Sequence, residues 1–311
     1  MTAGMGPIAR RSEIVALPPV KLSVVVPCFN EELTLKRCVE RVLALRDDDL
    51  ELEVVIVDDC SRDRSADIAR DLAAGHRDVR LLRHPRNQGK GAALRTGFRE
   101  VTGDFVAVQD ADLEYDPQEL RALIEPLRDG RADVVIGSRF KGAGPHRVLY
   151  FWHSLGNALL TLLSNVFTDL NLSDMESGYK VFRREIIQSI DIEEDRFGFE
   201  PEIVAKVAHM RARVYEMAIS YSGRTYEEGK KITWKDGLRA LYCIVRYNAF
   251  RLPSRMGLRS DIRFPSSRLL ARAGASIPPQ SRQDHRKPRR GAECPEVRTA
   301  CHRVRGGARG G

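Results

Sequence analysis

Short apolar segments alternate, along the first 140 residues, with segments whose apolar side chains recur every three or four positions. Apolar runs of four to eight residues are typical of buried strands, and the three-to-four-residue recurrence is typical of helices that cover a sheet. Strands are expected at 22–27, 52–57, 79–82, 105–109 and 133–137, and helices at 31–45, 61–74, 91–101 and 117–128. Strands that alternate with helices predict an α/β fold with a mostly parallel sheet and flanking helices.

The segment 148–167 has a different pattern, because it is apolar around most of its circumference and carries no charge. Its polar residues fall on one stripe of a helix: His153, Ser154, Asn157, Thr161, Ser164 and Asn165. Such a helix either packs in the core or lies in a membrane interface with its apolar face down, and the sequence leaves both open. Further helices are expected at 198–209 and 234–250, and a strand at 214–221. No stretch of about 20 residues is apolar throughout, so no transmembrane helix is expected.

Charge and composition divide the chain into a flexible leader at 1–20, a folded domain at 21–250 and a basic tail at 251–311. The tail holds 15 Lys+Arg against 4 Asp+Glu, a net +11, which leaves −3 for residues 1–250. Apolar periodicity fades in the tail, so we expect it to be disordered. It also lacks interleaved aromatic residues, so no nucleic-acid partner is expected. A basic tail of this kind is either a solvated extension or an anchor for anionic lipid.

The six cysteines are scattered and form no Cys-x-x-Cys pair, so neither a zinc site nor a disulfide framework is indicated. The N-terminal segment lacks a basic stretch followed by an apolar one, so no secretory signal is expected. Both observations favour a reducing, cytoplasmic environment.

Two carboxylates stand at the end of the strand expected at 105–109, in the order Asp110-Ala111-Asp112. At the carboxyl edge of a sheet they can share one divalent cation, and hard cations such as Mg²⁺ and Mn²⁺ favour oxygen ligands. The alternative is a polar turn at a strand end. By itself the pair does not choose between these interpretations.

Four motifs decide the context, each following an expected strand or opening an expected helix. They are Pro27-Cys-Phe-Asn-Glu31, Val57-Asp-Asp-Cys-Ser61, Asn87-Gln-Gly-Lys-Gly-Ala-Ala-Leu-Arg-Thr-Gly97 and Gln109-Asp-Ala-Asp112. In this order and spacing they resemble family 2 glycosyltransferases, over about residues 22–235. The resemblance implies the GT-A fold, which is a Rossmann-like, mostly parallel sheet with flanking helices.

Within that family, three later segments are similar to soluble dolichol-phosphate mannose synthases and related polyprenyl-phosphate hexosyltransferases. They are Gly137-Ser-Arg-Phe140, Asp174-Met-Glu-Ser-Gly-Tyr-Lys180 and Arg224-Thr-Tyr-Glu-Glu-Gly-Lys-Lys231. Two positions depart from the family pattern, with Phe29 in place of Tyr and Glu114 in place of Gln. Phe29 keeps a ring that can stack on a base, and Glu114 adds charge beside the metal.

The resemblance implies a set of residues that bind the nucleotide sugar: Pro27, Phe29, Glu31, Val57, Asp58, Asp59, Lys90, Asp110, Ala111, Arg224, Lys230 and Lys231. Lys90 combines a point charge with the free N–H groups of a helix N-terminus, which suits a diphosphate. Asp110, Asp112 and Glu114 are the expected metal ligands. Arg224 with Lys230 or Lys231 is expected to close over the diphosphate as a lid.

The acceptor side is expected to use Arg139, Arg147 and Ser154, because a guanidinium matches phosphate oxygens. A polyprenyl phosphate is already anionic and needs no general base, whereas a sugar hydroxyl does. Asp174 is the candidate base for a hydroxyl acceptor. The expected catalytic residues are therefore Asp112, Arg139 and Asp174.

The leading hypothesis is an inverting, Mg²⁺- or Mn²⁺-dependent transfer of a hexose to a dolichyl or polyprenyl phosphate. Mannose from GDP-mannose is favoured, and a UDP-hexose stays open. The protein is expected to lie at the cytoplasmic face of a membrane as a peripheral protein. The alternatives are transfer to a sugar hydroxyl with Asp174 as base, and a GT-A domain that binds without catalysis.

Overall fold

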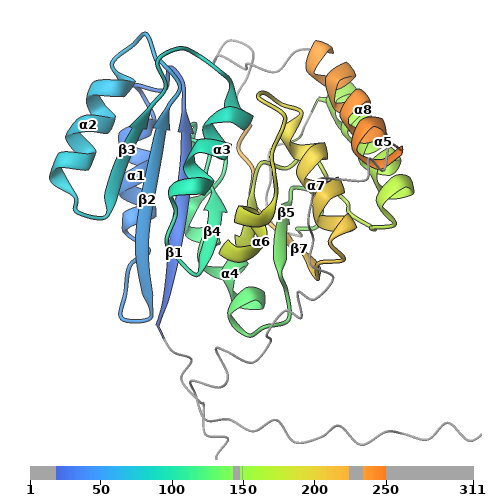
Figure 1. Ribbon diagram of the computed structural model, residues 1–311, viewed down its shortest axis with the longest axis horizontal. Helices are drawn as coiled ribbons and strands as arrows, with labels where there is room; N and C mark the ends of the chain where they lie inside the picture. Colours follow the sequence, from blue (N-terminus) through green and yellow to red (C-terminus); the bar gives the residue numbers. More distant parts are fainter. Residues whose placement is uncertain (1–18, 143–147, 149, 224–233, 250–311) are drawn as a thin grey trace, which may run out of the picture. The chain divides into compact units, whose positions relative to one another are not determined.

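The computed structural model of the protein describes residues 19–142, 148, 150–223 and 234–249. The described residues form a seven-stranded sheet in the order β3-β2-β1-β4-β6-β5-β7 (Figure 1). The strands are β1 (Val20–Cys28), β2 (Leu50–Asp58), β3 (Val79–Arg83), β4 (Phe105–Val108), β5 (Val134–Ser138), β6 (Lys180–Arg183) and β7 (Val214–Ala218). The α/β architecture expected from the sequence is confirmed.

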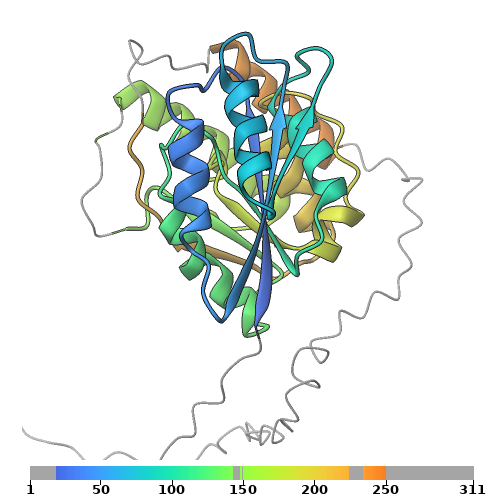
Figure 2. The same cartoon turned by 90° about the vertical axis from the view of Figure 1, so that its left-hand side faces the viewer.

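Helices cover both faces of this sheet (Figure 2). They are α1 (Leu35–Leu43), α2 (Ser65–Gly75), α3 (Lys90–Glu100), the 3-10 turn η1 (Pro117–Glu119), α4 (Leu120–Arg128), α5 (Phe151–Thr168), α6 (Arg184–Ser189), α7 (Phe199–His209) and α8 (Trp234–Ala249). Buried side chains of α1, α2 and α4 share one apolar core with the sheet, and those of α3, α6 and α7 share the other. None of the described helices is long and apolar enough to cross a membrane.

One strand runs against the others and thereby shapes the site. β6 pairs antiparallel with both β4 and β5, whereas the other strand pairs are parallel. Its first residue, Lys180, pairs with Ile136 close to the carboxyl end of β5. The loop that enters β6 therefore lies at the same sheet edge as the loops that leave β4 and β5, where ligands of such sheets bind.

The first helix is shorter than expected, because residues 31–34 form a turn before α1 begins at Leu35. The Glu31 carbonyl accepts hydrogen bonds from the N–H groups of Thr34 and Leu35, and the Glu31 N–H donates to the Ser65 hydroxyl at 2.7 Å. Tertiary bonds from the start of α2 thus hold this segment, and helical periodicity alone does not reveal them.

α5 lies with its polar stripe toward the protein. Thr161 and Ser164 are buried, and the Asn165 amide bonds the backbone of Leu172 at both of its ends. Most of its large apolar side chains are exposed instead, while Leu160 and Leu163 are partly buried against the core. Of the two placements left open by the sequence, burial of the whole apolar face in the core is therefore wrong.

The start of α3 touches the segment before α7 so closely that a side chain at Gly91 does not fit. A Cβ atom there would lie 2.2 Å from the Glu194 carbonyl oxygen. We expect Gly91→Ala to lower the free energy of unfolding by about 1–3 kcal/mol, because backbone has to move. Urea denaturation measures this loss.

Gly75→Ala is the matched control, because a Cβ atom at the end of α2 meets nothing within 4 Å. The helix propensity of alanine predicts an unchanged or slightly higher stability, by up to about 1 kcal/mol. Equal stabilities of the two variants would contradict the close contact.

Candidate active site

Five loops converge at one edge of the sheet. Four of them leave β1, β2, β4 and β5, and the fifth enters β6: residues 29–31, 59–61, 109–115, 139–141 and 174–179. Among the residues that the structure describes, these loops hold most of those that the sequence singles out. The structure therefore brings the expected donor and acceptor residues to a common edge.

Asp59 organises the loop that precedes α3. Its Oδ1 accepts from the Gln88 N–H at 2.9 Å and lies 2.7 Å from His84 Nδ1, while its Oδ2 accepts from the Gly89 N–H at 2.7 Å. The side chain is almost fully buried. Both oxygens of Asp59 are thus engaged by the protein, so its observed role is to position the turn that carries Lys90.

The remaining expected nucleotide contacts differ in accessibility. Pro27 and Phe29 are partly exposed at the end of β1, whereas Glu31 and Asp58 are buried. Asp58 Oδ1 accepts from the Ser61 N–H at 3.2 Å, and its Oδ2 lies 3.1 Å from the Arg83 guanidinium. Two further predicted residues, Val57 and Ala111, are buried. Phe29 is the one aromatic residue of this set, and its ring is partly accessible to solvent.

Lys90 is the first residue of α3 and lies between two carboxylates. Its Nζ is 2.9 Å from Asp110 Oδ1 and 3.2 Å from Glu200 Oε1. Burial opposes the charged ammonium, but Asp110 and Glu200 outweigh it and raise the pKa of Lys90. The ammonium is therefore permanently charged, and it stands beside the N-terminus of a helix, as an anion-binding site requires.

Glu200 was not predicted from the sequence. It is buried in the first turn of α7, more than 100 residues after Lys90 in the chain. Its sequence signal is weak, because an acidic residue at the start of a helix is ordinary. Only the folded chain shows that it faces the turn that carries Lys90.

The three expected metal ligands do not form a ready-made cage. Asp110 pairs with Lys90, Asp112 Oδ1 accepts from the Glu114 N–H at 3.1 Å, and Glu114 Oε2 accepts from the Tyr221 hydroxyl at 2.8 Å. Across the described part of the chain, no three His, Cys, Asp or Glu side chains are grouped to hold one ion. The chemistry still fits a magnesium-like cation, because such ions are held by one or two carboxylates together with substrate phosphates.

On the expected acceptor side, Arg139 forms a bidentate ion pair with the fully buried Asp174. Arg139 Nε lies 2.6 Å from Asp174 Oδ2, and a terminal nitrogen of the guanidinium lies 2.7 Å from Oδ1. Asn157 of α5 bonds both side chains, at 3.1 Å and 3.3 Å. Burial opposes the charge on Arg139, but Tyr115 and Asp174 raise its pKa, so it stays cationic.

This arrangement leaves Asp174 poorly suited to be a general base. Its side chain is fully buried, and both oxygens accept bonds from Arg139. Glu216 of β7 holds the same loop by accepting from the N–H groups of Ser173 and Asp174. Asn157 and Glu216 are further positioning residues that sequence reasoning missed, since each acts only through its place in the fold.

Other expected residues are less informative. Ser154 lies on the polar stripe of α5 and is partly exposed, and its N–H donates to the Tyr150 carbonyl at 3.0 Å. Arg147, Arg224, Lys230 and Lys231 lie outside the described residues, as do residues 1–18 of the leader and the tail. Their expected roles stay predictions.

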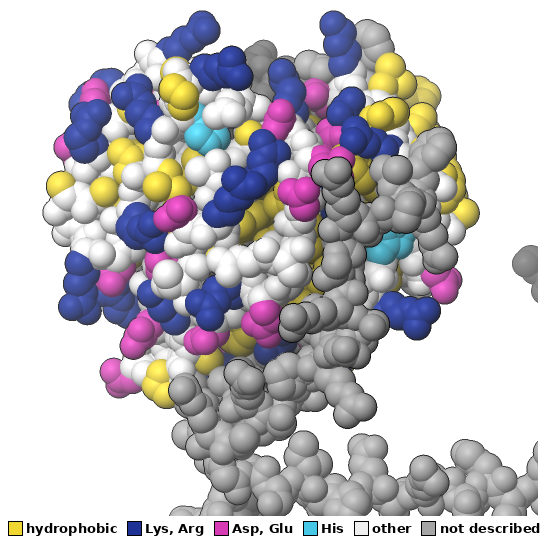
Figure 3. All heavy atoms as spheres, in the orientation of Figure 1, with side chains coloured by type: hydrophobic (Ala, Val, Ile, Leu, Met, Phe, Trp, Pro, Cys, Tyr) yellow, Lys and Arg dark blue, Asp and Glu magenta, His cyan; other side chains and the backbone are white. Residues whose placement is uncertain are grey.

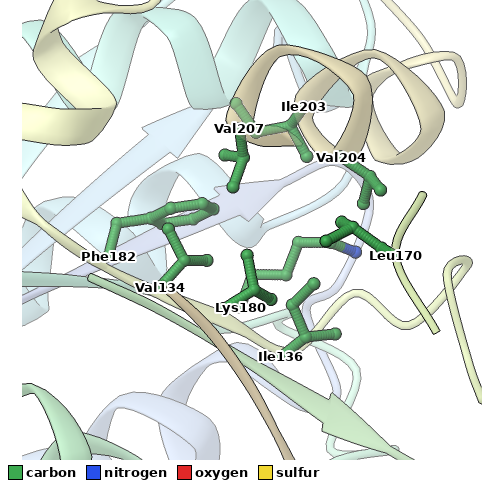
Figure 4. A pocket seen from close by; sticks show the side chains of 9 residues that line it. Val134, Ile136, Leu170, Lys180, Phe182, Ile203, Val204 and Val207 are labelled. Carbon is green, nitrogen blue, oxygen red and sulfur yellow. The ribbon is translucent and has the colours of Figure 1, made fainter. Parts of the chain in front are cut away.

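Beneath the loop that enters β6, a lysine crosses an apolar space. Figure 4 shows the Lys180 side chain among the apolar residues Val134, Ile136, Leu170, Phe182, Ile203, Val204, Val207 and Val214. Its ammonium donates to the carbonyls of Met175 and Ser177, and burial lowers its pKa to about 8. Burial, with Glu200 nearby, raises the pKa of Glu176 to about 8. Lys180 therefore holds the 174–178 loop in place through these two hydrogen bonds.

The comparison with known families gives the class of the protein. Residues 23–191 match the model of glycosyl transferase family 2, which is more than half of the chain. The chain belongs to this family, and its sheet has the GT-A fold.

Its curated relatives include a hexosyltransferase and two mannosyltransferases. The chain is 34% identical over 219 residues to the low-salt glycan biosynthesis hexosyltransferase Agl6 of Haloferax volcanii, which covers 70% of this chain and 51% of the relative. It is 29% identical over 214 residues to the dolichol-phosphate mannosyltransferase of Pyrococcus furiosus, which covers 68% and 59%. The undecaprenyl-phosphate mannosyltransferase of Micrococcus luteus is 30% identical over 223 residues, with 68% and 87% covered. The chain thus spans about half to three fifths of the first two relatives.

Solved structures confirm the fold. The glucosyl-3-phosphoglycerate synthase of Mycobacterium tuberculosis, in complex with Mn²⁺, UDP and glucosyl-3-phosphoglycerate, superposes with a TM-score of 0.58. It is 20% identical, and the match covers 74% of this chain and 81% of the other. At this identity the likeness concerns the fold alone.

Glu176, a partly exposed residue whose Oε1 is shielded from solvent, predicts a pH dependence of stability. Its pKa rises from 4.5 to about 8 on folding, so the folded protein binds the proton more tightly than the unfolded chain between these values. The stability that this proton contributes is present below about pH 4.5 and is lost as the pH rises to about 8, by at most about 1.4 kcal/mol per pH unit. Lys180 acts in the opposite direction, but only above about pH 8.

We therefore expect Glu176→Gln to remove a fall in stability that the unmodified protein shows between about pH 5 and pH 7.5. Urea denaturation of both proteins at the two pH values measures it. Parallel changes in the two proteins would contradict a raised pKa for Glu176.

Proposed function

We propose that this protein transfers a hexose from a nucleotide sugar to a dolichyl or polyprenyl phosphate, with mannose and GDP-mannose favoured. The names of the relatives support a lipid-phosphate acceptor, because two of them are mannosyltransferases that act on dolichol phosphate and undecaprenyl phosphate. The likeness of the motifs to polyprenyl-phosphate hexosyltransferases supports the same acceptor. A UDP-hexose remains the second candidate donor.

The observation that carries the choice of acceptor is the Arg139–Asp174 pair. A hydroxyl acceptor needs a base to take its proton, and Asp174 has both oxygens committed to a guanidinium in a buried setting. A phosphate monoester is already anionic and needs only alignment and a cation beside it. Arg139 supplies that cation, and Asp174 and Asn157 hold it in place.

On the donor side, Lys90 and the N-terminus of α3 are placed to bind the diphosphate of the nucleotide. A divalent cation held by Asp110 and Asp112 would neutralise the charge that develops on this leaving group. A phosphate oxygen of the acceptor then attacks C1 of the sugar as the bond from C1 to the diphosphate breaks. A single displacement inverts the configuration at C1.

We also propose a peripheral location at the cytoplasmic face of a membrane. A polyprenyl phosphate is confined to the bilayer, so its transferase has to work at that surface. The six scattered cysteines agree with a reducing compartment.

Transfer of label from a panel of radioactive nucleotide sugars into organic-extractable lipid tests the proposal. With polyprenyl phosphate present, one donor should label the lipid, and EDTA should abolish the signal. Asp112→Asn should lower transfer by about a hundredfold or more, since a metal ligand is lost. Asp71→Asn, at an exposed position of α2, is the control that should keep full activity. Metal-dependent donor hydrolysis without lipid labelling would instead support a hydroxyl acceptor.

Asp174→Asn separates positioning from base catalysis. If Asp174 positions Arg139, the variant should raise the KM for polyprenyl phosphate about tenfold or more and should keep the shape of the pH–rate profile. If Asp174 is a base, kcat should collapse and the acid limb of the profile should disappear.

Asp133→Asn is the matched control for this variant. Asp133 is also buried and paired with an arginine, Arg213, at 2.7 Å, but it precedes β5 at the opposite sheet edge. Both variants should lose stability, because each removes the charge of a buried carboxylate that is paired with an arginine, and the loss should be smaller for Asp133→Asn because the Arg213 side chain is 43% exposed. Only Asp174→Asn should change the KM for the acceptor.

A further inference from the structure

The amphipathic character of α5 is inverted relative to that of a helix on a globular surface. Its polar stripe faces the protein, while large apolar side chains one and two turns apart face outward. Trp152, Leu159 and Leu162 are 78%, 63% and 61% exposed, respectively. The other exposed apolar residues of this helix and the residue before it are Tyr150, Phe151, Leu155, Val166 and Phe167. The helix carries no charge.

α8 extends this apolar surface. It packs against α5, and the two helices lie side by side in Figure 1. α8 buries one apolar face around Cys243 and Ile244 and exposes a second, made of Leu238, Leu241, Tyr242 and Val245. Hydrophobic side chains accordingly gather over this part of the molecule in Figure 3. We call the exposed apolar residues of α5 and α8, together with Tyr150, the α5–α8 face.

Basic groups border the α5–α8 face. Arg239 and Arg246 of α8 lie over the ring of Tyr242, at 4.9 Å and 5.9 Å from its centroid. Arg239 also pairs with Glu194, and Arg246 pairs with Glu193, so these ion pairs hold both guanidiniums at the border of the face. The 251–311 segment, with its net +11, follows α8 directly in the chain.

We propose that the α5–α8 face docks the protein on a lipid bilayer that contains anionic lipid. Apolar side chains with tryptophan and tyrosine among them suit the interfacial zone of a bilayer, and a basic border suits anionic headgroups. The inference stands on this surface alone, and it deepens the proposed function by naming the surface through which the enzyme meets its lipid.

A bilayer fits this surface better than a second copy of the chain. A two-fold dimer places the same patch on both sides of the interface. It would bring the arginines that border the face, Arg239 and Arg246, of two copies together. Anionic lipid neutralises the same charges, at about 1 kcal/mol for each basic residue near the surface.

Docking through this face also brings the acceptor side of the site to the bilayer. Asn157 lies on the inner side of α5, where it bonds Arg139 and Asp174. The apolar residues that would enter the bilayer lie on the other side of the same helix, which is about 10 Å across. A phosphate at Arg139 can therefore stay joined to a chain that is embedded in the membrane.

Flotation of the full chain with lipid vesicles tests the proposal. The vesicles contain phosphatidylcholine with or without phosphatidylserine, and no polyprenyl phosphate, so the result does not depend on the acceptor. Leu159→Asp combined with Leu162→Asp should weaken binding to the anionic vesicles about tenfold or more. Leu33→Asp is the matched control, because Leu33 is 91% exposed but lies outside the α5–α8 face, and it should bind as the unmodified protein does.

Two further measurements make the outcome decisive. Binding of the donor nucleotide sugar should be equal in all three proteins, which shows that the double variant is folded. Sedimentation without lipid reports any self-association. The proposal would be overturned if the double variant bound the vesicles as well as the unmodified protein does. It would also be overturned if the unmodified protein bound no vesicles but formed a dimer that the double variant does not form. Vesicle binding with no sugar transfer would leave the docking face standing and would count against the proposed function alone.

Discussion

The site is organised around one positive charge, the ammonium of Lys90, whose side chain is only 16% exposed. It is shared by Asp110 from the end of β4 and Glu200 from the start of α7, so three distant segments meet at this point. These segments can approach so closely because two glycines, which lack side chains, lie at the contact. A Cβ atom at Gly178 would lie 2.7 Å from Asp110 Oδ2, and one at Gly91 would strike the backbone before α7. Buried charges are tolerated only when they are paired, so this contact holds the donor loops, the acceptor loop and α7 in one arrangement.

Much of this arrangement follows from local signals. The strands, the carboxylates at their ends and the glycine-flanked lysine are visible as runs and motifs, because a parallel sheet gathers its strand ends at one edge. Residues that act across the fold leave no such signal. Glu200, Asn157 and Glu216 are single polar residues in ordinary helix or strand positions, and only packing brings them to Lys90, Arg139 and the 174–178 loop. The direction in which α5 faces is likewise decided by its neighbours, since its helical pattern is the same either way.

Charged groups in and around the site differ in how burial and neighbouring charges act on them. Lys90 and Arg139 are kept cationic by carboxylates at close range, which raises the pKa of each despite burial. Burial instead brings the pKa of Lys180 and the pKa of Glu176 to about 8. Lys90 and Arg139 therefore keep their charge near neutral pH, whereas the charges of Lys180 and Glu176 change near pH 8. The charge of the expected substrate-binding residues and the stability of the 174–178 loop thus respond to different ranges of pH.

The reversed strand β6 has a consequence for cooperativity. Among the described strands, the four that carry the donor loops (β3, β2, β1 and β4) connect to β5 and β7 only through β6. This strand has four residues, and it begins with the buried Lys180. Local opening of β6 would break the hydrogen-bonded ladder between the two halves of the sheet at once. One of the two four-residue strands of the sheet therefore sets whether the half with the expected donor loops and the half with β5 and β7 unfold as one unit or separately.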